Sequence, residues 1–230
     1  MRARFIVIDG PIAGGKSTVK YIIRKFIGGK ALTITQSPYA LITYAVAMVI
    51  TRLVGNNGGT YPITYLEVRN PNLLGKLIKL FVVIDALQSV IIAVISKILT
   101  RLGVSVVVED YVPAIMHDHI LYNTLYSNHR LSKDPIIRTL HEMTIASMNN
   151  LNPLIIHVDA DVKTRFIRSI KRGFRIVSPE ILHDTARRRL LIKVARMLIN
   201  DDQVLIVDNN GPITNTKRQV IEILHKVYNE

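Results

Sequence analysis

Phe5-Ile-Val-Ile-Asp-Gly-Pro-Ile-Ala-Gly-Gly-Lys-Ser-Thr18 is the stretch of sequence that decides the fold. The apolar run at 5–8 predicts a buried parallel strand, and Gly10-x-x-x-x-Gly15-Lys16-Ser17 follows at once with the spacing of a phosphate-binding loop, or P-loop. Glycine permits backbone dihedral angles that are closed to residues with a Cβ, so successive N–H groups can turn inward around a phosphate. An amphipathic helix follows, and its positive end would point at the anion. The stretch therefore predicts a strand, a P-loop and a helix that together bind phosphate groups.

The side chains of this stretch predict how a nucleotide and a metal ion are held. Lys16 would reach the outer phosphates, and the Ser17 hydroxyl would coordinate Mg²⁺. Glu109 ends a second apolar strand, where a carboxylate can hold Mg²⁺ directly or through water, and Asp9 is a competing carboxylate. A glycine-rich turn that matches by chance is disfavoured, because a strand precedes the loop and a helix follows it. The predicted nucleotide-binding residues of the loop are Gly10, Pro11, Ile12, Ala13, Gly14, Gly15, Lys16, Ser17 and Thr18.

Composition limits the class of protein and its partners. The 230 residues suit one domain of generous size or a domain with an inserted lid, and 49% of them are hydrophobic, which is ample for a core. The sequence has no cysteine, which excludes disulfides, thiolate zinc sites and cysteine nucleophiles. The formal net charge of +13 predicts anionic partners, and nucleotides and nucleic acid both qualify. Abundant Ile, Val, Lys and Arg with no Cys also resemble the composition of thermophile proteins.

Two apolar stretches raise the question of a membrane. Residues 31–51 carry no charge, but Pro38 divides them and leaves a helical segment too short to span a bilayer. Residues 73–102 are interrupted by three lysines and one aspartate. We therefore expect a core or a subunit interface rather than a membrane segment. Because the strand and the P-loop begin within the first ten residues, we see no secretory signal and expect a cytoplasmic location.

Apolar strands and helical segments alternate along the chain. Strands are predicted at 5–8, 31–35, 104–111, 154–159 and 204–208. The helical stretch 73–102 is predicted to be broken or bent near 81–84. Strict alternation with nearly continuous apolar strands predicts a parallel sheet covered on both faces. The predicted fold class is α/β, a three-layer P-loop fold with five parallel strands, formed by residues 1–230 as a single domain with a short basic lid at about 168–180.

Basic residues cluster around Gly173, after the fourth predicted strand. Arg168 and Arg172 stand four residues apart, so on a helix they lie on one face and could close together over a triphosphate. A mobile basic lid would exclude water, which otherwise competes as phosphate acceptor. The alternative is a solvated basic face that aids solubility or binds nucleic acid. With a P-loop in the same chain we favour the lid, and we predict catalytic roles for Lys16, Arg168 and Arg172.

Polar and aromatic side chains inside apolar segments are further candidates. Asp85 and Gln88 lie within an apolar helix, and buried polar groups need partners, so they either bond to the backbone or face a pocket. Tyr111 could stack on a base or belong to the core. His117 and His119 flank Asp118, and we expect this triplet at the surface rather than at a metal ion.

These motifs resemble those of thymidylate kinases and the related deoxynucleoside kinases over most of the chain. The thymidylate kinase loop, acid-Gly-x-x-x-x-Gly-Lys-Ser-Thr, matches residues 9–18, and the helix motif Asp-Arg-Ala-Gln-His is echoed by Asp85-Ala-Leu-Gln-Ser89. The family's Asp-Arg-Tyr at the third strand end is Glu109-Asp-Tyr111 here, and its Lys-Arg-Gly recurs at 171–173. The resemblance implies ATP as donor, Mg²⁺, a nucleoside monophosphate acceptor and a homodimer. It also implies that Arg168 stacks on the adenine.

Departures from the family pattern bear on the acceptor. Gln36-Ser37-Pro38 replaces the family's Arg-Glu-Pro, and Ala86 and Asp110 replace two arginines expected beside the acceptor phosphate. The missing arginines favour a neutral acceptor. However, Ser37 stands where deoxynucleoside kinases carry the acid that deprotonates a hydroxyl. A general base must lie within hydrogen-bonding distance of the hydroxyl that it deprotonates, whereas a cation from another part of the chain could bind the acceptor phosphate from many directions. We therefore favour a monophosphate acceptor.

The sequence thus predicts a nucleoside monophosphate kinase that transfers the γ-phosphate of ATP to thymidine monophosphate. The predicted substrate-binding residues are Pro38, Asp85, Gln88 and Tyr111. One alternative is a deoxynucleoside kinase that phosphorylates a 5′-hydroxyl. Another is a catalytically silent nucleotide-binding protein whose basic surface binds nucleic acid or a partner. The intact loop disfavours the last alternative, so nucleic acid is not an expected partner.

Overall fold

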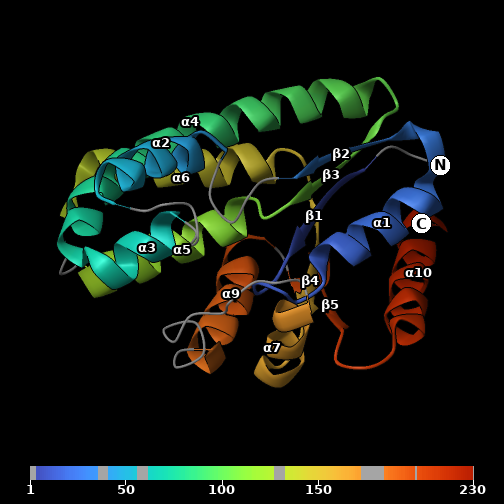
Figure 1. The fold of residues 1–230 in the computed structure, drawn as a ribbon. Helices are drawn as coiled ribbons and strands as arrows, with labels where there is room; N and C mark the ends of the chain where they lie inside the picture. Colours follow the sequence, from blue (N-terminus) through green and yellow to red (C-terminus); the bar gives the residue numbers. More distant parts are fainter. Residues whose placement is uncertain are drawn as a thin grey trace.

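The computed structural model describes residues 4–35, 41–55, 62–126, 133–171, 184–199 and 201–229. Its centre is a five-stranded sheet with the strand order β2-β3-β1-β4-β5 (Figure 1). The strands are β1 (Phe5–Asp9), β2 (Ala31–Thr35), β3 (Ser105–Glu109), β4 (Leu154–Asp159) and β5 (Val204–Asp208). Every neighbouring pair is parallel, which confirms the predicted α/β P-loop fold with five parallel strands.

Helices cover both faces of the sheet because side chains alternate along the strands. Ile6 and Ile8 of β1 pack in one apolar cluster with α1 (Lys16–Ile27) and α10 (Ile213–Asn229). Phe5 and Val7 point to the opposite face and pack in a second cluster. That cluster takes in residues of α5 (Val112–Tyr126) and α9 (Asp184–Leu198). The sheet is therefore the middle of three layers, as its apolar strands predict.

A group of helices extends the fold beyond one side of the sheet (Figure 1). These helices share a third apolar cluster and are α2 (Leu41–Leu53), α3 (Pro62–Arg69), α4 (Pro71–Arg101) and α6 (Pro135–Asn149). The Asn70 side chain caps α4 by accepting from the amide of Leu73, and Pro71 takes the first position, where a missing N–H costs no helical hydrogen bond. The helix α4 runs unbroken through residues 81–84, where we expected a break or a bend.

The carboxyl ends of the strands meet at one edge of the sheet, where open parallel sheets bind ligands. The strand register places Ile8 beside Glu109 and Asp9 beside His157. The remaining elements are α7 (Val162–Lys171) and two 3₁₀ turns, Gly28–Lys30 and Asp201–Gln203. Because β1 leads directly into the P-loop, this edge also holds the predicted phosphate site.

Candidate active site

The P-loop connects β1 to α1 at the carboxyl edge of the sheet. Gly10 and Gly15 adopt φ angles of +142° and +104°, in the range that favours glycine. A Cβ on Gly10 would lie 2.3 Å from the backbone oxygen of Val158, so a side chain does not fit there. The amide of Gly14 donates to the carbonyl oxygen of Pro11 at 3.0 Å and closes the turn. The first turn of α1 follows Gly15 and directs its free N–H groups and positive end at the loop.

Lys16 folds back over the P-loop and is buried. Its Nζ donates to the carbonyl oxygens of Gly10 at 2.6 Å and Pro11 at 3.0 Å, and it lies 3.2 Å from Oδ1 of Asp110. A buried ammonium group needs such partners. A phosphate oxygen is a charged acceptor and can replace a neutral carbonyl oxygen with a stronger hydrogen bond. The position of Lys16 therefore suits a side chain that turns to bound phosphates.

Glu109, at the end of β3, lies against the start of α1. The Ser17 hydroxyl donates to its Oε1 at 3.1 Å, and the Lys20 Nζ donates to its Oε2 at 2.6 Å. Hydroxyl and carboxylate oxygens are the ligands that Mg²⁺ prefers, so Ser17 and Glu109 form a donor set that fits this ion. Two residues that lie far apart in the sequence are thus brought together beside the P-loop.

Asp9, the competing carboxylate, is fully buried at the end of β1. Its Oδ2 lies 3.6 Å from Nδ1 of His157 on the neighbouring strand β4. Burial raises the pKa of the Asp9 carboxyl, but the nearby His157 and Lys16 outweigh burial and hold this pKa below its ordinary value. The carboxylate that contacts Ser17 is Glu109, and Asp9 lies deeper, beneath the loop.

Asp110 occupies the position where the resemblance led us to expect an arginine. It has a positive φ of +57°, which is uncommon for a residue with a side chain and concentrates at functional sites. Its carboxylate is buried beside Lys16, at 3.2 Å. Burial raises the pKa of Asp110 to about 7; Lys16 opposes this rise, and the carboxylates of Asp9 and Glu109 add to it. The site therefore presents a carboxyl group, rather than a guanidinium, next to Lys16.

Two arginines of α7 reach the P-loop from the outside. Arg165 donates from Nη1 to the carbonyl oxygen of Ile12 at 3.1 Å, and Arg168 donates from Nη1 to that of Gly14 at 3.2 Å. Arg168 also donates from Nη2 to the backbone oxygen of Asn209 at 2.7 Å. These bonds hold the loop in shape and bring positive charge to it. Arg172 and residues 172–180 of the predicted lid lie outside the described residues.

Asn209 is a site residue that the sequence analysis missed. Its Nδ2 donates to the carbonyl oxygen of Gly14 at 2.6 Å, and its Oδ1 accepts from the hydroxyl of Thr216 at 2.7 Å. The residue directly follows β5 and is buried. A polar residue just after an apolar strand, at the edge that carries the P-loop, is the signal that could have found it.

Asp85 and Gln88, two predicted substrate residues, point from α4 to the first turn of α2. The Asp85 carboxylate accepts from the Thr43 hydroxyl and lies 3.0 Å from Nε2 of His119. The Gln88 Oε1 accepts from the amide of Ile42 at 3.1 Å. Gln88 thus bonds to the backbone, the first of the two arrangements that the sequence left open, whereas Asp85 is paired with side chains of neighbouring helices, an arrangement that the sequence analysis did not consider.

Tyr111 lies in the core. It is fully buried, its hydroxyl donates to the carbonyl oxygen of Ser89 at 2.6 Å, and its ring packs edge-on against Phe5. A ring enclosed in this way has no free face for a base, so the structure gives Tyr111 a packing role. Pro38 lies outside the described residues. The expectation that His117 and His119 lie at the surface was wrong, because each is only 5% exposed.

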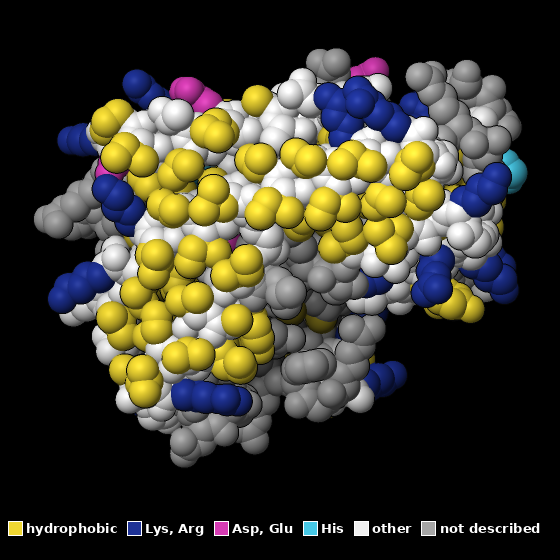
Figure 2. All heavy atoms as spheres, turned by 90° about the horizontal axis from the view of Figure 1, so that it is seen from above, with side chains coloured by type: hydrophobic (Ala, Val, Ile, Leu, Met, Phe, Trp, Pro, Cys, Tyr) yellow, Lys and Arg dark blue, Asp and Glu magenta, His cyan; other side chains and the backbone are white. Residues whose placement is uncertain are grey.

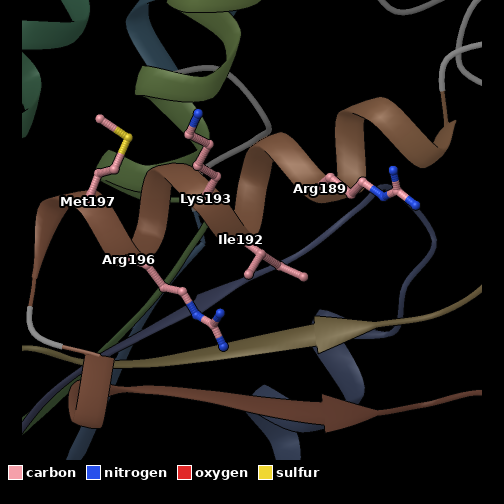
Figure 3. Close-up of a pocket in the computed structure, with 5 residues that line it drawn as sticks. All are labelled: Arg189, Ile192, Lys193, Arg196 and Met197. Carbon is pink, nitrogen blue, oxygen red and sulfur yellow. The ribbon is translucent and has the colours of Figure 1, made fainter.

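A separate pocket borders α9 (Figure 3). Its described lining residues are Arg189, Ile192, Lys193, Arg196 and Met197. Figure 3 shows that Ile192 and Arg196 point to one side of the helix, whereas Lys193 and Met197 point to the other. None of these five described residues is a predicted site residue.

Comparison with known proteins identifies the fold. No protein-family model matches the sequence, and no curated protein matches it. The chain is similar to the solved structure of a thymidylate kinase from Candida albicans, with 15% identity and a TM-score of 0.59 over 99% of this chain and 93% of that one. It is also similar to a thymidylate kinase from Ehrlichia chaffeensis, with 14% identity and a TM-score of 0.54 over 97% of this chain and 100% of that one. These likenesses show that the chain has the P-loop fold of the thymidylate kinases.

Proposed function

We propose that this chain, which has the fold of the thymidylate kinases, is an Mg·ATP-dependent phosphotransferase that acts on nucleoside monophosphates, thymidine monophosphate in particular. The observation that carries the proposal is the placement of Lys16, Ser17 and Glu109 where β1 and β3 end. Lys16 lies buried over the loop, and the Ser17 hydroxyl donates to Glu109 at 3.1 Å. A cation, a hydroxyl and a carboxylate placed together in this way can hold the phosphates and a divalent ion.

The residues of the chain would contribute positioning and charge, which is most of what phosphoryl transfer requires. The N–H groups of the loop and of the first turn of α1 bind phosphate oxygens. Lys16 exchanges its carbonyl partners for outer phosphate oxygens and neutralises the charge of the transferring group. Ser17 and Glu109 would hold Mg²⁺, and the bound ion would neutralise further phosphate charge. Arg168, with Arg172 in the predicted lid, adds positive charge and excludes water.

A deoxynucleoside is the second candidate acceptor, and the position of Asp110 favours it. Asp110 directly follows the end of β3, and its carboxylate lies 3.2 Å from the Lys16 ammonium. A dianionic acceptor phosphate at this point is repelled by a carboxylate, whereas a hydroxyl is not. The monophosphate remains the first candidate, because Ser37 takes the place of the general base of deoxynucleoside kinases.

The test is phosphate transfer from Mg·ATP, at elevated temperature, to a panel of nucleoside monophosphates and deoxynucleosides. Lys16→Ala serves as the blank. Arg218→Ala, on the exposed face of α10, serves as the matched control. Transfer to thymidine monophosphate that depends on Lys16 supports the proposal, and transfer only to a nucleoside supports the second candidate. Silence across the panel, together with salt-sensitive binding to DNA or RNA, would favour a catalytically silent protein instead.

We also propose a homodimer, formed through the apolar face of α2 and α4. Figure 2 shows this part of the surface as an extended area of hydrophobic side chains with Lys and Arg at its border. The large exposed hydrophobic residues of the two helices are Ile42, Val49, Leu53, Leu80, Leu87, Ile91, Val94, Ile95 and Ile98. From their exposed fractions they present on the order of 900 Å², which meets the ~800 Å² that each partner contributes to a standard interface. A second copy of the chain would bury this face.

The membrane is the competing occupant of this face. By length and composition α4 could cross a bilayer, because its most apolar window of 18 residues has a mean hydropathy of 2.3, but 44% of that window is buried within the fold. We therefore propose a cytoplasmic dimer. Light scattering should give about 52 kDa, twice the 25.9 kDa of the chain. Ile95→Glu should give a monomer, whereas Thr214→Glu on α10 should not. A wild-type monomer that sediments with anionic liposomes would contradict the dimer.

A further inference from the structure

Four polar side chains from four helices form a continuous hydrogen-bonded chain, which we call the Asp85 network. Its members are Thr43 of α2, Asp85 of α4, His119 of α5 and His141 of α6. The Thr43 hydroxyl donates to Oδ1 of Asp85, and Nε2 of His119 lies 3.0 Å from Oδ2. On its other side, Nδ1 of His119 lies 3.1 Å from Nε2 of His141, and the two rings stack with centroids 5.2 Å apart.

The network lies among apolar helices, where an unpaired carboxylate is costly. Thr43, Asp85 and His119 are 1%, 4% and 5% exposed. A buried carboxylate persists only when its oxygens are hydrogen-bonded, and here each oxygen has one identified donor. Because an ionised carboxylate only accepts hydrogen bonds, His119 must donate to it through Nε2–H. Among the described residues, His119 and Thr43 are therefore the side chains that fix the orientation of Asp85.

Asp85 in turn fixes the first turn of α2. It binds Thr43, and Gln88, one turn further along α4, accepts from the amide of Ile42 at 3.1 Å. The carboxyl end of β2 lies at the sheet edge that carries the P-loop. Residues 36–40 lead from there to the first turn of α2. These residues include Pro38, a predicted substrate residue. The first turn of α2 is therefore tied to Asp85 and Gln88, two of the predicted substrate residues.

We propose that His119 is a positioning residue for the acceptor side of the site. It acts through Asp85, holds the first turn of α2 in place, and does not itself touch a substrate. The inference rests on the proposed phosphotransfer function for its kinetic consequence, whereas the anchoring of α2 is independent of that function. The competing interpretation is that His119 only satisfies a buried carboxylate and supports the fold.

The first measurement is amide hydrogen exchange at Ile42 and Thr43. His119→Gln keeps an N–H donor near the position of Nε2, whereas His119→Leu removes it. His117→Gln is the matched control, since His117 is equally buried on the same helix but pairs with Asp118. We expect exchange at the start of α2 to rise about tenfold in His119→Leu and to stay near the wild-type rate in the other two variants. Unchanged exchange in a folded His119→Leu protein would overturn the proposal.

The second measurement separates positioning from general stability. With the acceptor that the wild type uses, His119→Leu should raise the acceptor KM about tenfold and leave the KM for ATP unchanged, and His119→Gln should restore it. Equal losses for both substrates would contradict the proposal and indicate a purely structural role. If His119→Leu does not fold, Thr43→Val removes the second donor to Asp85 and predicts the same pattern. If the wild type transfers phosphate to no acceptor, the proposed function fails, while the exchange measurement still decides whether His119 anchors α2.

Discussion

Lys16→Ala should abolish most of the Mg·ATP-dependent activity while the protein stays folded. In the proposed reaction Lys16 supplies a buried, preorganised positive charge to the transferring group. Removing one such group from an active site costs about 10² to 10³ in rate, or roughly 3 to 4 kcal/mol of transition-state stabilisation. The size of the effect follows from burial, because Lys16 is only 7% exposed and solvent screens its charge little.

The same substitution should have a small effect on stability. It removes a donor from the carbonyl oxygens of Gly10 and Pro11, and it removes the partner of Asp110. Since the pKa of Asp110 is about 7, this carboxyl can take up a proton rather than remain as an unpaired buried charge. We therefore expect the free energy of unfolding to fall by only about 1 to 2 kcal/mol.

The assay is ADP release in the presence of the preferred acceptor, with urea unfolding of both proteins. Arg218→Ala breaks an exposed 4.0 Å pair with Glu222, which contributes at most about 1 kcal/mol to stability, and it should leave the rate unchanged because Arg218 lies outside the proposed site. A folded Lys16→Ala protein that retains more than about a tenth of the wild-type kcat/KM would refute the assignment of the P-loop as the phosphate site.

Three further predictions concern stability. Gly10→Ala places a Cβ 2.3 Å from the Val158 oxygen at a φ of +142°, so it should lower the free energy of unfolding in urea by at least about 2 kcal/mol. Gly29→Ala is the control, because its Cβ would meet no atom within 4 Å, and it should not cause this loss. Burial and His119 lower the pKa of His141 to about 4 from 6.5, so the unfolded chain takes up a proton first as the pH falls. The free energy of unfolding should therefore drop between about pH 6.5 and 4, by up to roughly 3 kcal/mol, and His141→Gln should flatten this drop. The composition predicts a melting temperature above about 65 °C in calorimetry, and a value in the mesophile range would contradict the thermophile interpretation.

The parts of the site that are local in sequence were predictable. The strand, loop and helix at 5–18 follow from one run of residues, because glycine spacing and apolar periodicity act over short distances. The contact of Ser17 with Glu109 followed from a general property of parallel sheets, whose strands end at a common edge. Asn209 was not predicted as a partner of the loop, because it approaches the loop from the far end of the chain and only the strand order brings it there.

The histidines of α5 were misjudged for a different physical reason. This helix is enclosed by α4, α6 and α9, so it lacks the polar face by which a surface helix reveals its orientation. The sequence His117-Asp118-His119 therefore resembles an exposed polar triplet, although both histidines are buried. The burial of polar side chains on such a helix is explained only by their hydrogen-bond partners. For His119 these partners are Asp85 on α4 and His141 on α6.

The two sides of the proposed site differ in how far they are assembled. On the donor side, ATP would replace two backbone carbonyl oxygens and compete with Asp110 as partners of Lys16, within a loop that other residues already hold in shape. On the acceptor side, Asp85 and Gln88 are already bound to the first turn of α2, so a substrate that used them must compete with Thr43 and Ile42. Such a rearrangement lowers the affinity for a ligand, whereas a preformed loop binds its ligand without this loss of affinity. ATP should therefore bind first and independently, and acceptor affinity should be set by the same turn of α2 that His119 holds in place.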